Sequence, residues 1–366
     1  KFMSILNVEH LTHGFGDRAI FNNVSFRLLA GEHIGLVGAN GEGKSTFMNI
    51  VTGTLAPDEG KVEWNKHVRV GYLDQHAVLE KGMTIGQVLK SAFDPLLKKE
   101  ERMNEICDRL GTADPDEMDG LMEELGTIQD ELTLHDFYAI DAKVEEVARA
   151  LGLLDLGLDR DVTDLSGGQR TKVLLAKLLL EKPDILLLDE PLGALDAKIR
   201  KQMQIELKKI QQEVGITFIY VTHDQEEALS MSDTVVVMNN GEIQQIGAPT
   251  DIYNEPENRF VASFIGESNI IEGIMIKDFL VQFDGFEFEC VDKGFEDNEE
   301  IEVVLRPEDL DIVEPSQAKL NGVVRNVTFK GVHYEILVET ELRTYKVQTT
   351  DYAEVGRQVG LKFGPE

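Results

Sequence analysis

The 366-residue sequence is poor in cysteine and has no long apolar run. Cys107 and Cys290 are its only cysteines and lie far apart in sequence, which favours two unpaired thiols in a reducing cytosol over a disulfide scaffold. No apolar run approaches the roughly 18 residues that a membrane-spanning helix needs. Residues 1–10 predict a strand with polar interruptions rather than a signal peptide. The length predicts about two domains.

Positive charge is also scarce, because 36 Lys and Arg face 67 Asp and Glu, for a net charge of -31. Such a field repels nucleic acids and anionic lipid surfaces at long range, and no dense Lys/Arg cluster opposes it, so no direct DNA binding is expected. The same excess of acidic residues is also typical of proteins in which surface charge serves solubility. Nucleotide binding remains compatible with it where Mg²⁺ and a phosphate-binding loop supply local positive charge.

A glycine-rich segment, residues 38–46, matches the pattern G-x-x-x-x-G-K-[ST] of the phosphate-binding P-loop. Residues 33–37 predict a buried strand before it and residues 47–51 continue a helix after it, which is the context the motif requires. Lys44 is then expected to reach the β- and γ-phosphates of a nucleotide, and the Ser45 hydroxyl to bind Mg²⁺. The residues predicted to bind ATP in this loop are Gly38, Ala39, Asn40, Gly41, Glu42, Gly43, Lys44, Ser45 and Thr46.

Polar groups at the ends of two further strands suit the same chemistry. Residues 185–188 predict a buried strand that ends in Asp189 and Glu190, and neighbouring acids at the end of a parallel strand are typical of catalysis. Asp189 is expected to hold Mg²⁺ through water, and Glu190 to polarise the water that attacks the γ-phosphate. A strand at 217–221 leads to His223, for which a γ-phosphate contact is predicted.

Three weaker signals accompany these motifs. Gln75 follows a strand predicted at 68–73, where it is placed to reach a metal or an attacking water. Phe15 lies in a predicted turn, where its ring can stack on a purine, although a turn phenylalanine more often packs against its neighbours. A Ser-Gly-Gly turn also opens a helix predicted at 171–180, which makes a second anion site. Its residues are Ser166, Gly167, Gly168 and Gln169.

Helical periodicity dominates residues 77–160, between the two phosphate-binding turns. Apolar residues at helical spacing predict two helices, separated by Gly111 and Pro115, and a third helix follows through Val144 and Leu151. The first two predict a helical hairpin with acidic outer faces.

The last third of the chain changes to strands. An Asn-Gly turn within residues 235–243 predicts a hairpin, and from Ile270 the chain is all-β. The strands expected there are 271–276, 280–288, 300–305, 323–329, 334–338 and 344–348. Their spacing suits a small barrel or sandwich, and the absence of a catalytic constellation suggests a regulatory or structural module.

Taken in order, residues 38–46, Gln75, 165–170, 185–190 and His223 resemble the five motifs of the ATP-binding cassette (ABC) ATPases. The resemblance implies Mg²⁺-dependent hydrolysis of ATP, catalysed by Glu190, His223, Gln75 and Lys44, with Ser45, Gln75 and Asp189 around the metal. It also implies that Asp196 belongs to the D-loop and that Phe15 stacks on adenine. In this family two cassettes pair head to tail, so a homodimer is implied in which Ser166 and Gly168 contact the ATP of the partner.

From Pro191 onward the sequence resembles the ATPase subunits of binding-protein-dependent importers, in particular the spermidine/putrescine type. The segments that carry the resemblance are 190–196, 222–228, 246–249 and 305–309, and the β-rich end resembles the TOBE domain of such subunits. This implies membrane permease subunits and a binding protein as partners, and a cytoplasmic location on the inner face of the membrane.

The first 190 residues resemble a different group, the ABC-F proteins, which are ribosome-associated translation factors and antibiotic-protection proteins. The segments 35–41 and 165–173 carry this resemblance, and the predicted hairpin resembles the ABC-F arm. ABC-F proteins, however, hold two cassettes in one chain. A composite chain, natural or engineered, joined near residues 189–191, is therefore a third hypothesis. A non-enzymatic nucleotide-binding module is disfavoured by Glu190 and His223.

The sequence thus predicts an α/β fold: a P-loop domain with an inserted helical subdomain and a C-terminal, TOBE-like β-barrel domain. The expected boundaries are 1–240 for the ATP-binding domain, with its helical subdomain at about 77–164, 241–269 for a connecting segment, and 270–366 for the β domain.

Overall fold

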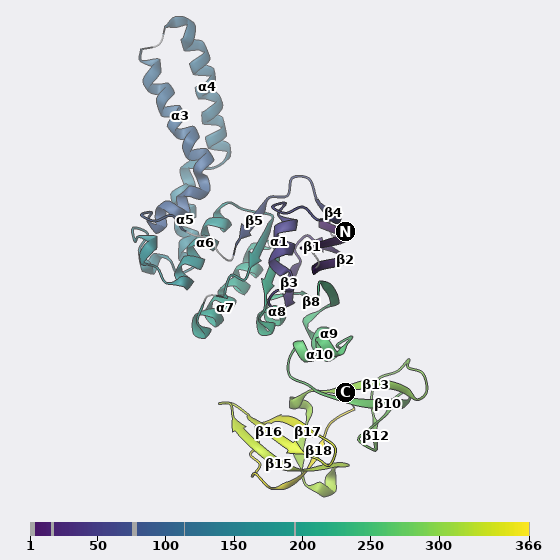
Figure 1. Ribbon diagram of the computed structural model, residues 1–366. Helices are drawn as coiled ribbons and strands as arrows, with labels where there is room; N and C mark the ends of the chain where they lie inside the picture. Colours follow the sequence, from purple (N-terminus) through teal and green to yellow (C-terminus); the bar gives the residue numbers. More distant parts are fainter. Residues whose placement is uncertain (1–3, 16–17, 75–78, 113, 194, 366) are drawn as a thin grey trace. The chain divides into compact units, whose positions relative to one another are not determined.

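The computed structural model describes residues 4–15, 18–74, 79–112, 114–193 and 195–365 (Figure 1). Two compact units make up the chain, Lys1–Pro249 and Thr250–Glu366. The first unit ends later than the expected residue 240, because strand β9 (Glu242–Gly247) pairs with β8 (Thr234–Asn239) inside its sheet. Asn240 and Gly241 have φ of 50° and 78°, as the predicted two-residue hairpin turn requires.

A six-stranded sheet in the order β5-β6-β7-β3-β8-β9 forms the centre of the first unit. The pairs from β5 to β8 are parallel, and β9 is antiparallel at the edge. The remaining strands are β3 (His33–Gly38), β5 (Val70–Leu73), β6 (Ile185–Asp189) and β7 (Thr217–Thr222). Because β6 and β7 are buried throughout, the sheet needs covering layers on both faces.

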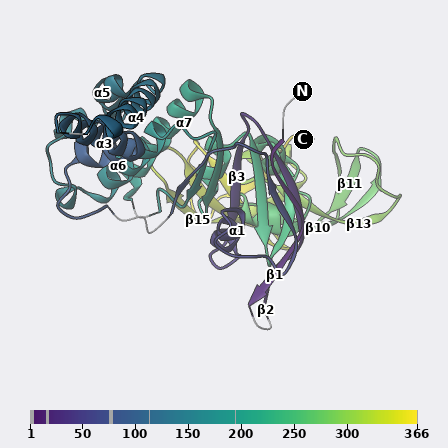
Figure 2. The ribbon, with the colours of Figure 1, turned by 90° about the horizontal axis from the view of Figure 1, so that it is seen from above.

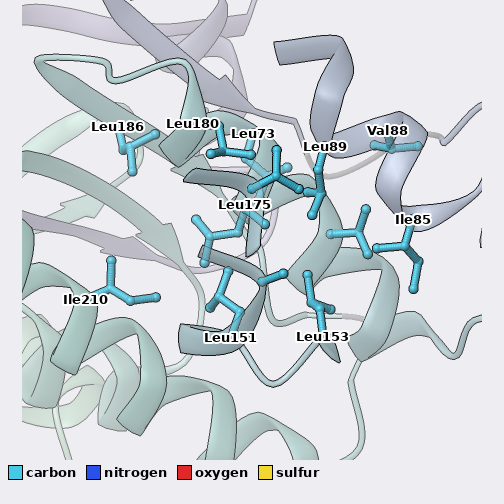
Figure 3. Close-up of a cluster of buried hydrophobic side chains, with 14 of the residues drawn as sticks. Leu73, Ile85, Val88, Leu89, Leu151, Leu153, Leu175, Leu180, Leu186 and Ile210 are labelled. Atoms are coloured by element: carbon cyan, nitrogen blue, oxygen red, sulfur yellow. The ribbon is translucent and has the colours of Figure 1, made fainter. Parts of the chain in front are cut away.

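Alternation along β6 and β7 divides their side chains between two cores. Leu186 and Phe218 join one cluster, whereas Ile185 and Ile219 join the other, as a side-chain period of two requires. The first cluster packs β6 and β7 against helices, and Figure 3 shows leucines of α2 and α6 meeting Leu73 and Leu186 there. The helices concerned are α2 (Ile85–Lys90), α5 (Ile140–Ala150), α6 (Gly167–Leu180) and α7 (Ala197–Val214).

The second core joins the sheet to helix α1 and to a three-stranded antiparallel sheet in the order β2-β1-β4. Its elements are α1 (Lys44–Val51), β1 (Ser4–Phe15), β2 (Arg18–Leu29) and β4 (Glu59–Trp64). Figures 1 and 2 both place this sheet and the helical subdomain on opposite sides of the first unit. Helix α8 (Gln225–Met231) follows β7.

The predicted helical hairpin is confirmed as α3 (Asp94–Leu110) and α4 (Pro115–Leu134), which project away from the sheet (Figure 1). Ion pairs join the two helices: Arg102 donates from Nε and Nη2 to the Glu124 carboxylate at 2.8 and 3.0 Å, and Lys99 pairs with Glu131. These pairs are partly exposed, and each contributes little by itself.

The second unit begins with two short helices, α9 (Pro249–Asn254) and α10 (Arg259–Phe264), followed by two antiparallel sheets. One sheet has the order β12-β11-β10-β13 and the other β14-β18-β15-β16-β17, and they share one apolar core rather than closing into a single barrel. The strands are β10 (Asn269–Lys277), β11 (Leu280–Phe283), β12 (Phe286–Glu289), β13 (Glu299–Leu305), β14 (Asp311–Val313), β15 (Leu320–Phe329), β16 (Tyr334–Glu339), β17 (Thr344–Thr349) and β18 (Gln358–Lys362).

Arg306 connects the short helices of this unit to its β sheets. Its buried guanidinium donates to the backbone carbonyls of Ala262 at 3.0 Å and Tyr253 at 2.5 Å and stacks 4.1 Å above the Tyr253 ring. Burial lowers the pKa of Arg306, which the charges of nearby acids partly oppose.

Asp284 connects the two sheets. The turn that it forms with Gly285 splits the single strand predicted at 280–288 into β11 and β12. Its side chain is 2% exposed. It accepts hydrogen bonds from Arg343 Nε at 2.9 Å and from the Tyr345 hydroxyl at 2.6 Å. Arg343 lies just before β17, and Tyr345 lies within it. Burial, followed by the Asp284 contact, raises the pKa of Tyr345.

Among the described residues, none of the helices combines the length and the apolar character needed to cross a membrane.

We predict that Asp284→Ala lowers the free energy of unfolding of the second unit by about 2–4 kcal/mol, because Arg343 and Tyr345 lose the partner of a buried ionic contact. Urea titration of the full chain, followed by tyrosine fluorescence and circular dichroism, measures this change. The exposed Asp297→Ala is the matched control. Equal stability of the two variants would contradict the role of Asp284.

Candidate nucleotide-binding site

Three neighbouring parallel strands end at one edge of the central sheet. In the strand register, Val37 of β3 lies opposite Thr222 of β7, and Asp189 of β6 lies opposite Val221. The segments that follow these strands therefore meet, which brings the glycine loop, the Asp189-Glu190 pair and His223 together as in other open α/β sheets.

The glycine loop has the backbone that a phosphate cradle needs. Gly41 and Gly43 have φ of 89° and 92°, which L side chains rarely adopt. A Cβ atom on Gly43 would lie 2.4 Å from Ile20 Cγ2. The Gly43 carbonyl accepts from the Phe47 amide at 2.8 Å, so helix α1 starts directly from the loop and directs its N-terminus toward it.

Lys44 lies in the middle of this edge. It is 5% exposed, and its Nζ donates to the carbonyls of Gly38 and Ala39 at 2.9 and 3.0 Å. Glu190 Oε1 lies 3.7 Å from the same nitrogen. Burial lowers the pKa of Lys44, and the charges of Glu190 and Asp189 oppose that change. The ammonium group is thus placed to exchange carbonyl partners for phosphate oxygens.

Asp189 and Ser45 face each other beside the lysine. The Ser45 hydroxyl donates to Asp189 Oδ1 at 3.4 Å. Burial raises the pKa of Asp189, and the Ser45 hydrogen bond lowers it, whereas the charges of Glu190 and Asp74 raise it further. A buried carboxylate beside a hydroxyl supplies the hard oxygen ligands that Mg²⁺ prefers, so these residues fit that ion.

Glu190 joins the lysine to the histidine. Its Oε2 atom lies 3.2 Å from His223 Nδ1, and its amide donates to the Val221 carbonyl at 2.9 Å. Its φ of 44° is unusual for a residue with a side chain, and such backbone conformations gather at functional sites. One carboxylate therefore contacts both Lys44 and His223.

Tyr72 is a residue at this edge that the sequence analysis missed. Its hydroxyl lies 3.5 Å from Asp74 Oδ2. Burial raises its pKa, as do the charges of Asp189 and Asp74, so the phenol stays protonated beside the acids. Its position one residue before the end of the strand predicted at 68–73 was the available signal.

The predicted signature segment starts helix α6 at Gly167, earlier than the expected residue 171. Ser166 is the N-cap: its hydroxyl accepts from the Gln169 amide at 3.4 Å, and the Gln169 side chain accepts from the Ser166 amide at 3.0 Å. A Cβ on the buried Gly168 would lie 2.7 Å from Ile199 Cγ2 of α7. Helix α6 packs with α2 and α5, whereas α1 packs on β3 and β6, so the two anion sites lie on different parts of the unit.

The remaining predicted site residues have distinct local roles. Asp196 caps α7, accepting from the amides of Lys198 and Ile199 at 3.1 Å. Phe15 is 56% exposed, at the end of β1, and its ring meets that of His13 edge-on at 4.9 Å. More than half of Phe15 is therefore exposed. Gln75 lies outside the described residues.

Together, the parallel sheet and the glycine loop define a P-loop nucleotide-binding protein, and comparisons with known proteins define its family. A family model described as "ABC transporter" matches residues 21–193, and one described as "TOBE domain" matches residues 303–366. The solved structure of CbiO1 from Clostridium perfringens, part of the ABC transporter complex CbiONQ, covers 69% of this chain and 92% of its own with a TM-score of 0.52 at 24% identity.

Two curated relatives extend the comparison. The spermidine/putrescine import ATP-binding protein PotA of Desulfitobacterium hafniense is 42% identical over 99% of this chain and 95% of its own length. The uncharacterized ABC transporter ATP-binding protein YfmM of Bacillus subtilis is 70% identical over 61% of this chain, which spans only 42% of that protein.

The chain therefore belongs to the ABC transporter ATP-binding protein family, and the predicted ABC ATPase fold with a C-terminal all-β TOBE domain is confirmed, although that domain has two sheets in place of the predicted barrel. The importer-type resemblance is confirmed along nearly the whole chain by PotA. The ABC-F and composite-chain hypotheses receive no support from the names and domains found.

We predict that Asp189→Asn raises the midpoint of thermal unfolding of the nucleotide-free protein at neutral pH. A carboxyl whose pKa is raised by folding stabilises the folded state below its ordinary pKa and loses that stabilisation as pH rises through the raised value. At neutral pH the ionised group is therefore destabilising, and asparagine removes this cost.

Thermal unfolding across a pH series measures the effect. The difference between wild type and Asp189→Asn should shrink as pH falls through the raised pKa of Asp189, whereas the exposed Asp159→Asn should show no such trend. A less stable Asp189→Asn at neutral pH would contradict the expectation.

Proposed function

We propose that this protein is the ATP-hydrolysing subunit of a polyamine importer, working with separate permease subunits and a binding protein. The importer assignment is supported by the PotA relatives, which are named as spermidine/putrescine import ATP-binding proteins and one of which aligns with 99% of the chain. The assignment of ATP hydrolysis is supported by the contact of one carboxylate, Glu190, with both Lys44 and His223.

Each side chain at the sheet edge has a role in this proposal. Lys44 and the amides of residues 38–46 bind the phosphates, because they combine an ammonium group with a helix N-terminus. Glu190 orients the attacking water and accepts its proton, and His223 contacts the γ-phosphate. Phe15 stacks on adenine with its exposed ring.

Ser45, Asp189 and Gln75 are proposed to hold Mg²⁺ with the nucleotide. The adjacency of the Ser45 hydroxyl and the Asp189 carboxylate supports the first two. When bound, the ion offsets charge on the phosphates during transfer. The same charge relieves the cost of burying Asp189.

The site is proposed to be completed by a second copy of the chain. Ser166 and Gly167 lie exposed at the N-terminus of α6, where the helix dipole attracts phosphate. Since α6 and α1 occupy different parts of the unit, a head-to-tail homodimer lets this segment, Ser166 to Gln169, reach the ATP of a partner. Asp196, on the loop before α7, would contribute at the same interface.

The subunit is proposed to lie in the cytoplasm against the inner face of the membrane, where the permease holds it. Retention by the membrane fraction only when permease subunits are co-expressed would support this location.

We predict that Glu190→Gln lowers the steady-state ATPase rate by roughly a hundredfold or more, because the water loses its proton acceptor. Binding of a fluorescent ATP analogue should be retained, since Lys44 and the loop remain. The exposed Glu117→Gln, on the helical hairpin, is the control. Unchanged turnover in Glu190→Gln would refute the assigned role.

We also predict that the specific ATPase activity rises with protein concentration, because two copies must combine to form each complete site. Ser166→Arg should abolish activity, and an equimolar mixture of Ser166→Arg with Lys44→Ala should regain part of it, since a mixed dimer holds one intact site. Concentration-independent specific activity and no recovery in the mixture would contradict the dimer.

The substrate class is tested by uptake of radiolabelled spermidine and putrescine in cells that lack their own importer ATPase. We expect uptake when this chain is supplied with its permease and binding protein, and none with Glu190→Gln. Normal ATPase activity without polyamine uptake would refute the polyamine assignment while leaving the ATPase intact.

A further inference from the structure

A partly buried polar cluster lies beside His223. It joins Asp224 and Glu227, from the segment 222–228, to a residue outside the motifs described so far. At its centre is Arg200, in the first turn of α7, with three groups around its guanidinium. Nη2 donates to the Leu195 carbonyl at 3.1 Å, Nη1 donates to Asp224 Oδ2 at 3.3 Å, and Nε lies 3.8 Å from Glu227 Oε1. One side chain thus contacts the residue before Asp196, the residue after His223 and helix α8.

Glu227 extends the cluster to the other side of His223. It is 3% exposed and accepts hydrogen bonds from the Thr222 hydroxyl at 2.6 Å and the Tyr220 hydroxyl at 2.9 Å. The Thr222 hydroxyl in turn accepts from the Asp224 amide at 3.0 Å. Both neighbours of His223 in the sequence are therefore fixed by groups that contact Arg200 or its partner.

The charges of the cluster depend on Arg200. A buried carboxylate is costly without a positive partner, and Arg200 is the partner of both Glu227 and Asp224. Burial raises the pKa of Tyr220 well above its usual range, and the neighbouring Glu227 charge adds to this. The phenol thus remains a donor to Glu227.

We propose that Arg200 is a positioning residue that couples the loop carrying Asp196 to the loop carrying His223. This inference rests on the proposed ATPase function. In the proposed dimer, Asp196 lies at the partner interface and His223 at the γ-phosphate, so a displacement of either loop reaches the other through Arg200. The coupling requires a donor fork, because Nη1 and Nη2 serve different loops.

A purely structural role and a positioning role predict different kinetics. Loss of structure lowers stability and every activity together, and restoring stability restores activity. Loss of positioning lowers kcat, while ATP binding at Lys44 and the glycine loop is retained, because a small displacement of a catalytic group lowers the rate of the chemical step.

The test compares Arg200→Met, Arg200→Lys and the double variant Arg200→Met/Glu227→Gln in the full chain. The matched control is Lys201→Met, an exposed lysine on the same helix. For each protein the kcat and KM for ATP, the Kd for a fluorescent ATP analogue and the midpoint of thermal unfolding are measured.

We expect kcat of Arg200→Met to fall about ten- to a hundredfold, with Kd within about twofold of wild type. Arg200→Lys should fall similarly, because one ammonium group cannot serve both loops. The double variant should regain most of the unfolding midpoint yet keep the low kcat, since the more deeply buried carboxylate, Glu227, is then neutral, whereas Asp224 remains charged but is 28% exposed. Lys201→Met should match wild type.

Three outcomes overturn the proposal. A kcat of Arg200→Met within about twofold of wild type shows that no coupling is needed. Recovery of kcat together with stability in the double variant assigns Arg200 a structural role alone. A wild-type chain that binds but does not hydrolyse ATP at any concentration refutes the proposed ATPase function itself, and this inference with it.

Discussion

The site depends on a buried cluster of like charges held at the end of strand β6. Asp189 and Glu190 are adjacent acids with little access to water, and the Lys44 ammonium group lies 3.7 Å from the Glu190 carboxylate. Burial penalises the charged forms of both Asp189 and Lys44, and each charge lowers the penalty of the other. This balance is incomplete, because the pKa of Asp189 remains raised. In the proposed site, a nucleotide bound with a metal ion would supply the missing positive charge for Asp189 and phosphate oxygens for Lys44 in one ligand.

The sheet explains why these charges can lie together at all. Strands β6 and β7 have apolar side chains on both faces and fill two separate cores, so their polar residues can lie only at the strand ends. Parallel pairing then aligns those ends at one edge. Burial on both faces thus explains both the apolar interior of the strands and the polar character of the edge at which they end.

Local patterns in the sequence predicted much of this arrangement. The P-loop and its helix, the hairpin ends at Leu110 and Pro115, and the Asn240-Gly241 turn all follow from residues close in sequence. The start of α6 was missed because the capping box of Ser166 and Gln169 extends the helix into the glycines. The turn at Asp284 was missed although Asp284 and Gly285, with φ of 47° and 81°, form a two-residue hairpin turn that local sequence indicates. Only the contacts of Asp284 with Arg343 and Tyr345 depend on residues far along the chain.

The groups at the site that sequence patterns did not reveal share this dependence on distant partners. Tyr72 and Arg200 belong to ordinary elements, a strand and a helix, and the one local signal, the position of Tyr72 near a strand end, does not identify its partners. Their significance arises only where β5 meets β6 and where α7 meets α8. The motifs supply the groups proposed to contact the nucleotide, whereas Tyr72 and Arg200 contact the segments that carry those groups. A site of this kind is therefore recognised from motifs but understood only from the packing around them.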